Sequence, residues 1–185
     1  MDLRRLERNI AANEAYVKIN YPGENFISDT AELRAANRYT KKLTLPENVR
    51  VAASRVNIKS NEEKRTLRKE LRQAGILSRM GNSVFLTPEK PKFGVRVTDG
   101  IINGLPYEFR NVTGKVRRIE TRFRDAKRKG DKVNVFMNIE PNVSHNEARR
   151  RIGLVLGSHP EYTGKIIASL GNGKRIYFWD SKGFR

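Results

Sequence analysis

The sequence contains no cysteine and only two histidines, His145 and His159. The absence of cysteine excludes disulfide bonds, thiolate metal sites and a cysteine nucleophile. With two histidines, neither a zinc site nor a ribonuclease that works through a histidine pair is expected. No apolar run is long enough for the core of a signal peptide or for a membrane span. We therefore expect no membrane association and a cytoplasmic site of action.

Acidic residues are scarce relative to basic ones. The chain of 185 residues has 38 Lys and Arg against 20 Asp and Glu, which gives a net charge of +18. Most of this excess, +14, lies in residues 61–185. Such a field concentrates polyanions, so nucleic acid is the favoured partner. A structural protein of the ribosome and a basic protein that binds an acidic protein would have a similar composition.

The first 60 residues are expected to form a separate, mainly helical N-terminal region or linker. Apolar positions in residues 2–16 follow a weak helical pattern, and Pro22-Gly23 interrupts the chain. A second helix is expected from about Asp29 to Lys42. The remainder of this region is expected to form a loop, followed by a stretch in which apolar and polar residues alternate only loosely.

Residues 61–185 have a sharper pattern, which predicts an α/β or α+β domain with a mixed β-sheet flanked by helices. The expected element order is α-β-β-β-α-β-α-β-β. Ser60 and Ser144, each followed three residues later by Glu, mark two helix starts. The clearest amphipathic helix spans residues 115–129. The expected strands are 83–87, 95–102, 105–110, 133–139, 166–170 and 175–179.

Two carboxylates are expected to face each other across a hairpin. Asn103-Gly104 is a strong signal for a two-residue turn, and such a turn places Asp99 directly opposite Glu108. Because side chains alternate along a strand, Arg110 projects on the same face as Glu108. Opposed carboxylates repel each other, so the pair requires solvation, a proton or a cation between them.

A divalent cation at this hairpin would suit phosphodiester hydrolysis. Mg²⁺ and Mn²⁺ take oxygen ligands and can activate water, while Arg110 could hold a phosphate oxygen. An exposed charged face with an ordinary Glu–Arg salt bridge is the alternative interpretation of the same residues.

The order of these features resembles the PD-(D/E)XK nuclease superfamily, which has a restriction-endonuclease-like fold. More specifically, residues 70–140 are similar to the C-terminal tRNA-nuclease domains of bacterial contact-dependent growth-inhibition toxins and related polymorphic toxins. The matching stretches are Glu70 through Gly81, Ser83 through Leu86, and Asp99 through Arg110. The basic helix and the strand that begins at Val133 follow in the same order.

The resemblance implies that Asp99 and Glu108 are metal ligands and catalytic residues, with Glu70 as a third carboxylate near the metal. Arg110 stands where the superfamily has lysine, and Arg cannot readily act as a base. Thr98 stands where proline is usual. The implied activity is a metal-dependent endonuclease that cleaves RNA, in particular tRNA, and is delivered from another cell as a toxin. Such a toxin also implies an acidic immunity protein as a partner.

Two other functions remain open at this stage. A non-catalytic nucleic-acid-binding or structural protein, with a degenerate nuclease fold, would simply solvate the opposed carboxylates. A metal-free ribonuclease would cleave RNA in EDTA. We expect basic side chains of helix 115–129 and of the following helix to bind the nucleic-acid backbone, and a solvated charged face is the alternative interpretation. These are Lys115, Arg117, Arg118, Arg122, Lys127, Arg149 and Arg150.

Overall fold

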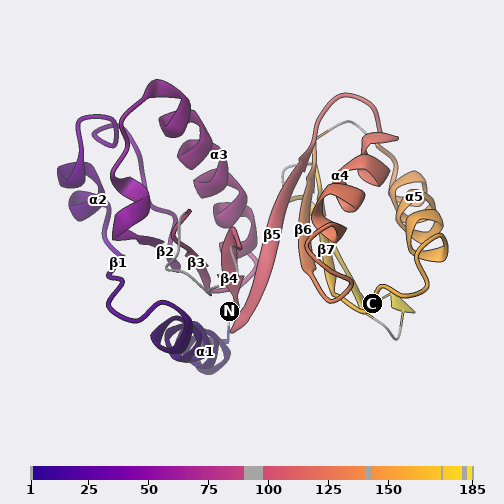
Figure 1. Cartoon of the computed structure of the whole chain (residues 1–185), viewed down its shortest axis with the longest axis horizontal. Helices are drawn as coiled ribbons and strands as arrows, with labels where there is room; N and C mark the ends of the chain where they lie inside the picture. Colours follow the sequence, from indigo (N-terminus) through magenta and orange to yellow (C-terminus); the bar gives the residue numbers. More distant parts are fainter. Residues whose placement is uncertain (1, 90–97, 141–142, 172, 181–182, 185) are drawn as a thin grey trace. The chain divides into compact units, whose positions relative to one another are not determined.

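The computed structural model describes the chain except for residues 1, 90–97, 141–142, 172, 181–182 and 185 (Figure 1). It is an α/β protein with a mixed β-sheet, as predicted. The chain divides into two compact units, Met1–Pro106 (unit 1) and Tyr107–Arg185 (unit 2). The boundary suggested near residue 60 therefore lies inside unit 1. No helix in the described residues is both long enough and apolar enough to cross a membrane.

Unit 1 contains all of the N-terminal region together with the first part of the predicted nuclease-like domain. Its elements are α1 (Leu3–Asn20), β1 (Phe26–Ile27), α2 (Thr30–Ala36), β2 (Val49–Ala52), a 3-10 helix η1 (Ala53–Val56), α3 (Asn61–Ser78), β3 (Val84–Leu86) and β4 (Gly100–Ile102). β1 pairs antiparallel with β2, β2 parallel with β3, and β3 antiparallel with β4.

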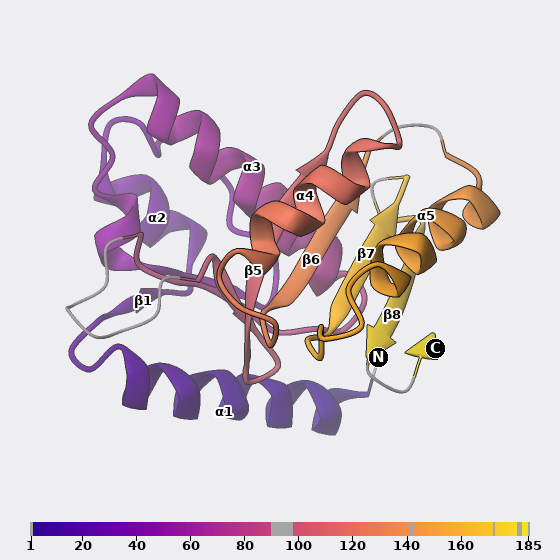
Figure 2. The same ribbon diagram turned by 45° about the vertical axis from the view of Figure 1, so that its right-hand side comes forward.

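Helices α1 and α3 lie on opposite sides of these strands (Figures 1 and 2). Val17 of α1 and Tyr21, which follows the end of α1, pack against Phe85 and Ile101, which point to one face of the sheet. Helix α3 contacts β2 and β3. It begins where the capping pattern predicts, because the Ser60 hydroxyl accepts a hydrogen bond from the Glu63 amide at 3.2 Å.

The predicted Asn103-Gly104 turn is present, and α1 supports it. Both residues have positive φ, 50° and 83° respectively. The buried side chain of Asn13 accepts a hydrogen bond from the Gly104 amide at 2.6 Å and donates to Ser83 Oγ at 3.0 Å. The N-terminal helix therefore packs against the hairpin region rather than standing apart as a linker.

Unit 2 is a sheet with both of its helices on one face. Its elements are β5 (Leu105–Val112, whose first two residues belong to unit 1), α4 (Arg118–Lys127), β6 (Asn134–Ile139), α5 (His145–Gly157), β7 (Ile166–Leu170), β8 (Arg175–Asp180) and β9 (Gly183–Phe184). Strands β5, β6 and β7 are parallel, and β8 and β9 continue the sheet in antiparallel pairs.

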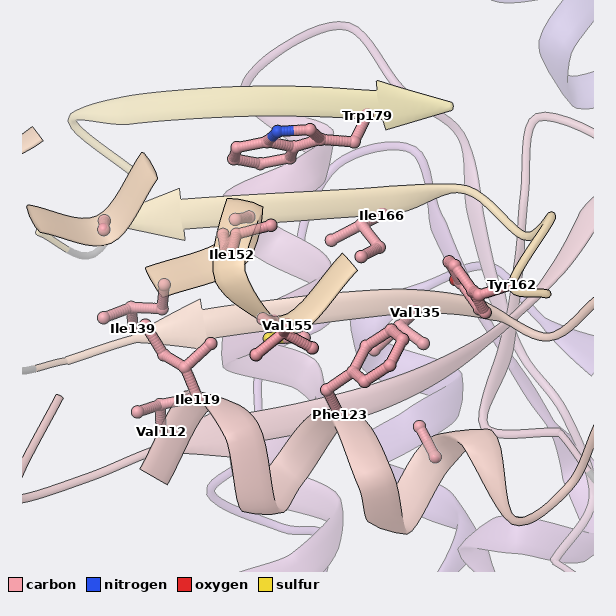
Figure 3. Close-up of a cluster of buried hydrophobic side chains, with 14 of the residues drawn as sticks. Val112, Ile119, Phe123, Val135, Ile139, Ile152, Val155, Tyr162, Ile166 and Trp179 are labelled. Atoms are coloured by element: carbon pink, nitrogen blue, oxygen red, sulfur yellow. The ribbon is translucent and has the colours of Figure 1, made fainter. Parts of the chain in front are cut away.

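The core of unit 2 lies between this sheet and the two helices (Figure 3). Ile119 and Phe123 of α4 and Ile152 of α5 pack onto alternate, inward-facing residues of the strands. Among these strand residues are Val112, Val135, Met137, Ile139, Ile166 and Trp179. The amphipathic pattern of the sequence predicted which face of α4 is buried.

Several element boundaries differ from the sequence prediction. β1, β2 and η1 were not predicted, because two- and four-residue elements carry little periodicity. Helix α2 ends at Ala36, where Asn37 takes an extended conformation. Helix α4 begins only at Arg118, because Lys115 and Val116 accept hydrogen bonds from the amides three residues later and form a turn. The first residues of the strand expected over 95–102 lie outside the described part of the chain.

Candidate active site and nucleic-acid interface

Glu70, the carboxylate predicted on the helix of unit 1, is held by a buried arginine. Arg55 of η1 donates from Nε to Glu70 Oε2 at 3.1 Å and from one terminal nitrogen to Oε1 at 2.5 Å. The two side chains are only 3% and 12% exposed. Such a forked pair uses both oxygens of the carboxylate and fixes its orientation.

Asp99 directly precedes β4, in the same part of unit 1. Its backbone carbonyl accepts hydrogen bonds from the Arg55 guanidinium at 3.2 Å and from the Thr87 amide at 3.3 Å. Burial raises the pKa of the Glu70 carboxyl, Arg55 lowers it, and the negative charges of Asp99 and Glu89 raise it again. The net effect raises the pKa of the Glu70 carboxyl above its ordinary value, with burial as the largest cause.

Glu108, the carboxylate predicted on the second strand of the hairpin, is buried in unit 2. It lies on β5, and its side chain is 2% exposed. Its Oε2 accepts from Arg110 at 3.1 Å and from the Lys129 ammonium at 2.7 Å. The contact with Arg110 confirms that these two side chains share a face of the strand.

The direct opposition of Asp99 and Glu108 stays a prediction, because Asp99 belongs to unit 1 and Glu108 to unit 2. Within the part of the chain that the structure describes, no three side chains of the metal-binding types gather closely enough to hold a metal ion. Glu70 and Glu108 instead each hold a basic side chain.

Sequence reasoning did not identify Arg55 or Lys129 as members of the candidate site. Arg55 lies in a stretch without clear periodicity, 15 residues before Glu70. Lys129 was grouped with the basic helix, but it follows the end of α4 and contacts Glu108, 21 residues earlier in the chain. No local spacing marks either contact, since both depend on how distant segments pack.

The basic residues predicted to bind nucleic acid fall into two groups. Lys115, Arg117 and Arg118 are exposed just before and at the start of α4, and they have no acidic partner among the described residues. By contrast, Lys127 pairs with Asp131 at 2.8 Å and Glu161 at 2.6 Å. Acidic partners also accompany Arg122 (Asp125, 3.8 Å) and Arg150 (Glu147, 3.2 Å). Arg149 is exposed on α5.

The fold is similar to that of a chain in a toxin and immunity complex. That solved structure is the CdiA-CT/CdiI toxin and immunity complex from Burkholderia pseudomallei. The two chains are 23% identical with a TM-score of 0.49, and the match covers 67% of this chain and 91% of that chain. No protein-family model and no curated protein matches the sequence.

The two carboxylate clusters differ in what they can do chemically. Glu70 and Arg55 form a nearly closed pair with little access to water. Glu108 is buried, but Lys129 is 35% exposed and Arg110 is 19% exposed. Both cations can therefore reach an anion from solvent while they remain in contact with the buried carboxylate. Such a pairing is suited to binding a phosphate next to a carboxylate.

Proposed function

We propose that the chain is a metal-dependent endonuclease that hydrolyses phosphodiester bonds in RNA. Glu108 carries this proposal: a carboxylate with a 2% exposed side chain is held between Arg110 and the partly exposed Lys129. A substrate phosphate can reach these cations from solvent, while the carboxylate that they contact stays buried. Buried charged groups held by specific charge partners are frequent at functional sites.

In this proposal Asp99 and Glu108 are the metal ligands and Glu70 is a further carboxylate near the metal. Carboxylate oxygens are the donors that Mg²⁺ and Mn²⁺ prefer, and to hold such an ion Glu70 and Glu108 would have to exchange a basic partner for it. When bound, the ion would supply an activated water and stabilise charge on the phosphate. Arg110 binds a phosphate oxygen through its fork of donors.

The superfamily has a lysine at the position of Arg110, and in this proposal Lys129 takes the role of that lysine. Its ammonium has three donors on a flexible stem and lies 2.7 Å from Glu108 Oε2. From there it can orient a water molecule or neutralise charge that develops on the phosphate. Arg110 does not need to act as a base in this arrangement, so its departure from the superfamily pattern is compatible with activity.

The positive charge supports nucleic acid as the substrate. The net charge is +18, and Lys115, Arg117 and Arg118 are exposed without an acidic partner among the described residues. These residues are proposed to hold the phosphate backbone, together with Arg122, Lys127, Arg149 and Arg150. The preference for tRNA, the delivery into another cell as a toxin and an acidic immunity protein rest on the resemblance of residues 70–140 to toxin nucleases.

A cleavage assay tests the proposal directly. The purified chain is incubated with total RNA and with plasmid DNA, in Mg²⁺, in Mn²⁺ and in EDTA. Asp99→Ala, Glu108→Ala and Lys129→Met are compared with Glu14→Ala, which removes a half-exposed carboxylate that pairs with Arg50. We expect metal-dependent RNA cleavage by the wild type and the control, and its loss in the other three variants. RNA cleavage that persists in EDTA would instead support a metal-free ribonuclease.

A non-catalytic nucleic-acid-binding protein is the second candidate. It is favoured by the salt bridges of Glu70 and Glu108, which neutralise both carboxylates without a metal ion. This function predicts RNA binding without cleavage under every metal condition. It also predicts that Glu108→Ala strengthens or preserves RNA binding, since that variant removes a negative charge.

A further inference from the structure

The outward face of α3 in unit 1 carries a stripe of basic side chains (Figure 1). Its members, here called the α3 basic stripe, are Arg65, Arg68, Lys69 and Arg72, and all four are exposed. At 3.6 residues per turn they fall within about 100° of the helix circumference. The opposite face, which includes the buried Leu71, contacts β2 and β3. The stripe therefore faces away from the strands of unit 1.

The acidic residues of α3 do not neutralise this stripe. The carboxylate of Glu63 accepts a hydrogen bond from the Lys59 amide at 2.6 Å, ahead of the helix. Glu70 is turned inward and held by Arg55. Glu62, the remaining acidic residue of α3, lies in the first turn and precedes the stripe. The positive charge of the outward face is thus left without a counter-charge from its own helix.

The arrangement within the stripe is unfavourable for the free protein. Arg65, Arg68 and Lys69 form no ion pair with an acidic residue in the part of the chain that the structure describes. Arg65 and Lys69 are four residues apart, as are Arg68 and Arg72. Like charges at this spacing lie next to each other on a helix and destabilise it. An anion that binds along the stripe would remove this repulsion.

The helices of unit 2 differ, because acidic side chains accompany many of their cations. On α4, Arg122 pairs with Asp125 at 3.8 Å. On α5, Arg151 pairs with Glu147 at 3.0 Å. The sequence indicated the basic helix of unit 2 as the surface for a nucleic-acid backbone. Part of the charge on that helix is neutralised by its own side chains, whereas the charge of the α3 basic stripe is not.

The chemistry of the stripe suits a row of phosphates. It extends over about 10 Å from Arg65 to Arg72, at 1.5 Å per residue, and nucleic acid presents negative charges at regular intervals over such a length. Arginine can also hold a phosphate through two parallel hydrogen bonds. Helix α3 contains no aromatic residue on which a base could stack. Contacts to the backbone, which do not depend on base sequence, are therefore expected.

We propose that the α3 basic stripe is a second nucleic-acid-binding surface, which holds the phosphate backbone of RNA without reading its sequence. The inference rests on the proposed function for the identity of the polyanion as RNA. It requires no bound metal ion, because the cations themselves make the contacts. It also assigns a substrate contact to unit 1, whereas the basic residues indicated by the sequence all belong to unit 2.

The test compares two variants that remove the same amount of charge. The stripe variant replaces three cations of the stripe with glutamine: Arg65→Gln, Arg68→Gln and Lys69→Gln. The control variant replaces three arginines that have acidic neighbours: Arg50→Gln, Arg128→Gln and Arg151→Gln. Binding of labelled tRNA, labelled oligouridine and labelled polyglutamate is measured by fluorescence anisotropy over a series of NaCl concentrations. EDTA is present throughout, so that metal-dependent cleavage does not interfere.

We expect the stripe variant to bind both RNAs about 10- to 100-fold more weakly than wild type at about 0.1 M NaCl. The slope of log K against log [NaCl] should become shallower by about 2–3, since each lost phosphate contact contributes about 0.7–0.9. The slope of the control variant should change by less than about 1. In urea the stripe variant should be at least as stable as wild type, because glutamine favours helix and the repulsion is removed.

Three results would overturn the inference. Equal losses of RNA binding in the two variants would show that only net charge matters. Unchanged RNA binding with weakened binding of polyglutamate would indicate an acidic protein as the partner of the stripe. If the stripe variant does not fold, Arg68→Gln alone decides. A slope equal to that of wild type in this variant would overturn the inference, and a slope shallower by about 0.7–0.9 would support it.

Failure of the inference and failure of the proposed function are distinguishable, because binding is measured in EDTA and cleavage in Mg²⁺. A wild type that binds RNA through the stripe but cleaves no RNA overturns the proposed function and leaves the binding surface intact. A wild type that cleaves RNA, accompanied by a stripe variant that binds RNA equally well, overturns the inference alone.

Discussion

Unit 1 and unit 2 each bury a glutamate beside basic side chains, but they do so in different ways. Glu70 is paired with Arg55, whose side chain is 3% exposed, so the ion pair is closed to solvent. Glu108 is paired with Arg110 and Lys129, whose side chains are 19% and 35% exposed, so its partners stay in contact with water. A closed pair fixes geometry, whereas an open pair can exchange one partner for a substrate phosphate. The difference predicts that Glu70 matters more for stability and Glu108 more for substrate chemistry.

The largest effect on stability is expected from Glu70→Ala. This change leaves the guanidinium of Arg55 buried without its carboxylate, and breaking a buried pair in this way costs about 3–5 kcal/mol. The free energy of unfolding, measured in urea, should fall by that amount. The double variant Arg55→Met/Glu70→Leu should lose much less than the sum of the two single changes, because an apolar pair replaces the ionic one. Additive losses would show that the two side chains are not coupled.

A smaller loss is expected from Glu108→Gln. The amide oxygen still accepts hydrogen bonds, and both cationic partners can turn toward water, so only the charge-assisted part of about 1.5–3 kcal/mol is at risk. Urea unfolding under the same conditions checks the ranking against Glu70→Ala. Under the proposed function this milder substitution nevertheless abolishes RNA cleavage. If Glu108→Gln lost more stability than Glu70→Ala, the description of the Glu70 pair as closed and the Glu108 pair as open would be wrong.

The hairpin turn provides the next prediction. Asn13→Ala removes the acceptor of the Gly104 amide and the donor to Ser83 Oγ, at a cost of about 1–3 kcal/mol for polar groups left without a partner. Gly104→Ala should also destabilise the chain, since Gly104 has φ of +83° and an added Cβ would lie 2.9 Å from the Cβ of Ala12. Ala12→Gly should relieve part of the Gly104→Ala loss in the double variant. Thermal unfolding of these variants distinguishes steric contact with α1 from backbone strain, which Ala12→Gly cannot relieve.

The sequence predicted those features of the fold that arise from neighbouring residues. Helices α3, α4 and α5, the strands of unit 2 and the Asn103-Gly104 turn follow from periodicity, caps and turn chemistry. The close association of α1 with the hairpin was not predictable in the same way. Its polar contact is made by Asn13, a single residue 91 positions before Gly104 in the chain.

The candidate site shows the same limit. The sequence indicated Glu70, Asp99, Glu108 and Arg110, and it predicted the shared strand face on which Arg110 contacts Glu108. It could not indicate that Arg55 binds Glu70, because nothing in the local pattern marks a buried arginine. The contacts of Arg55 with Glu70 and of Lys129 with Glu108 therefore form only when distant segments pack together.

The smallest effect is expected on the surface of unit 2, where the carboxylates that pair with Lys127 are about half exposed. A hydrogen bond from Lys127, together with backbone and His159 contacts, lowers the pKa of the Glu161 carboxyl to about 2, from its usual value of 4.5. A lowered folded-state pKa adds stability above pH 4.5, and this contribution is lost as the pH falls from about 4.5 toward about 2. In Lys127→Met the pKa of Glu161 should return toward 4.5, which NMR titration of the carboxyl measures. The thermal midpoint should differ slightly from wild type at pH 7 and converge with it near pH 2, since exposed pairs contribute little.

Arg128→Met is the control, because Arg128 is 82% exposed and lies 3.7 Å from Asp125 rather than near Glu161. An unchanged Glu161 titration in Lys127→Met would show that Lys127 does not hold this carboxylate, and would leave Asp131 as the acidic partner of Lys127.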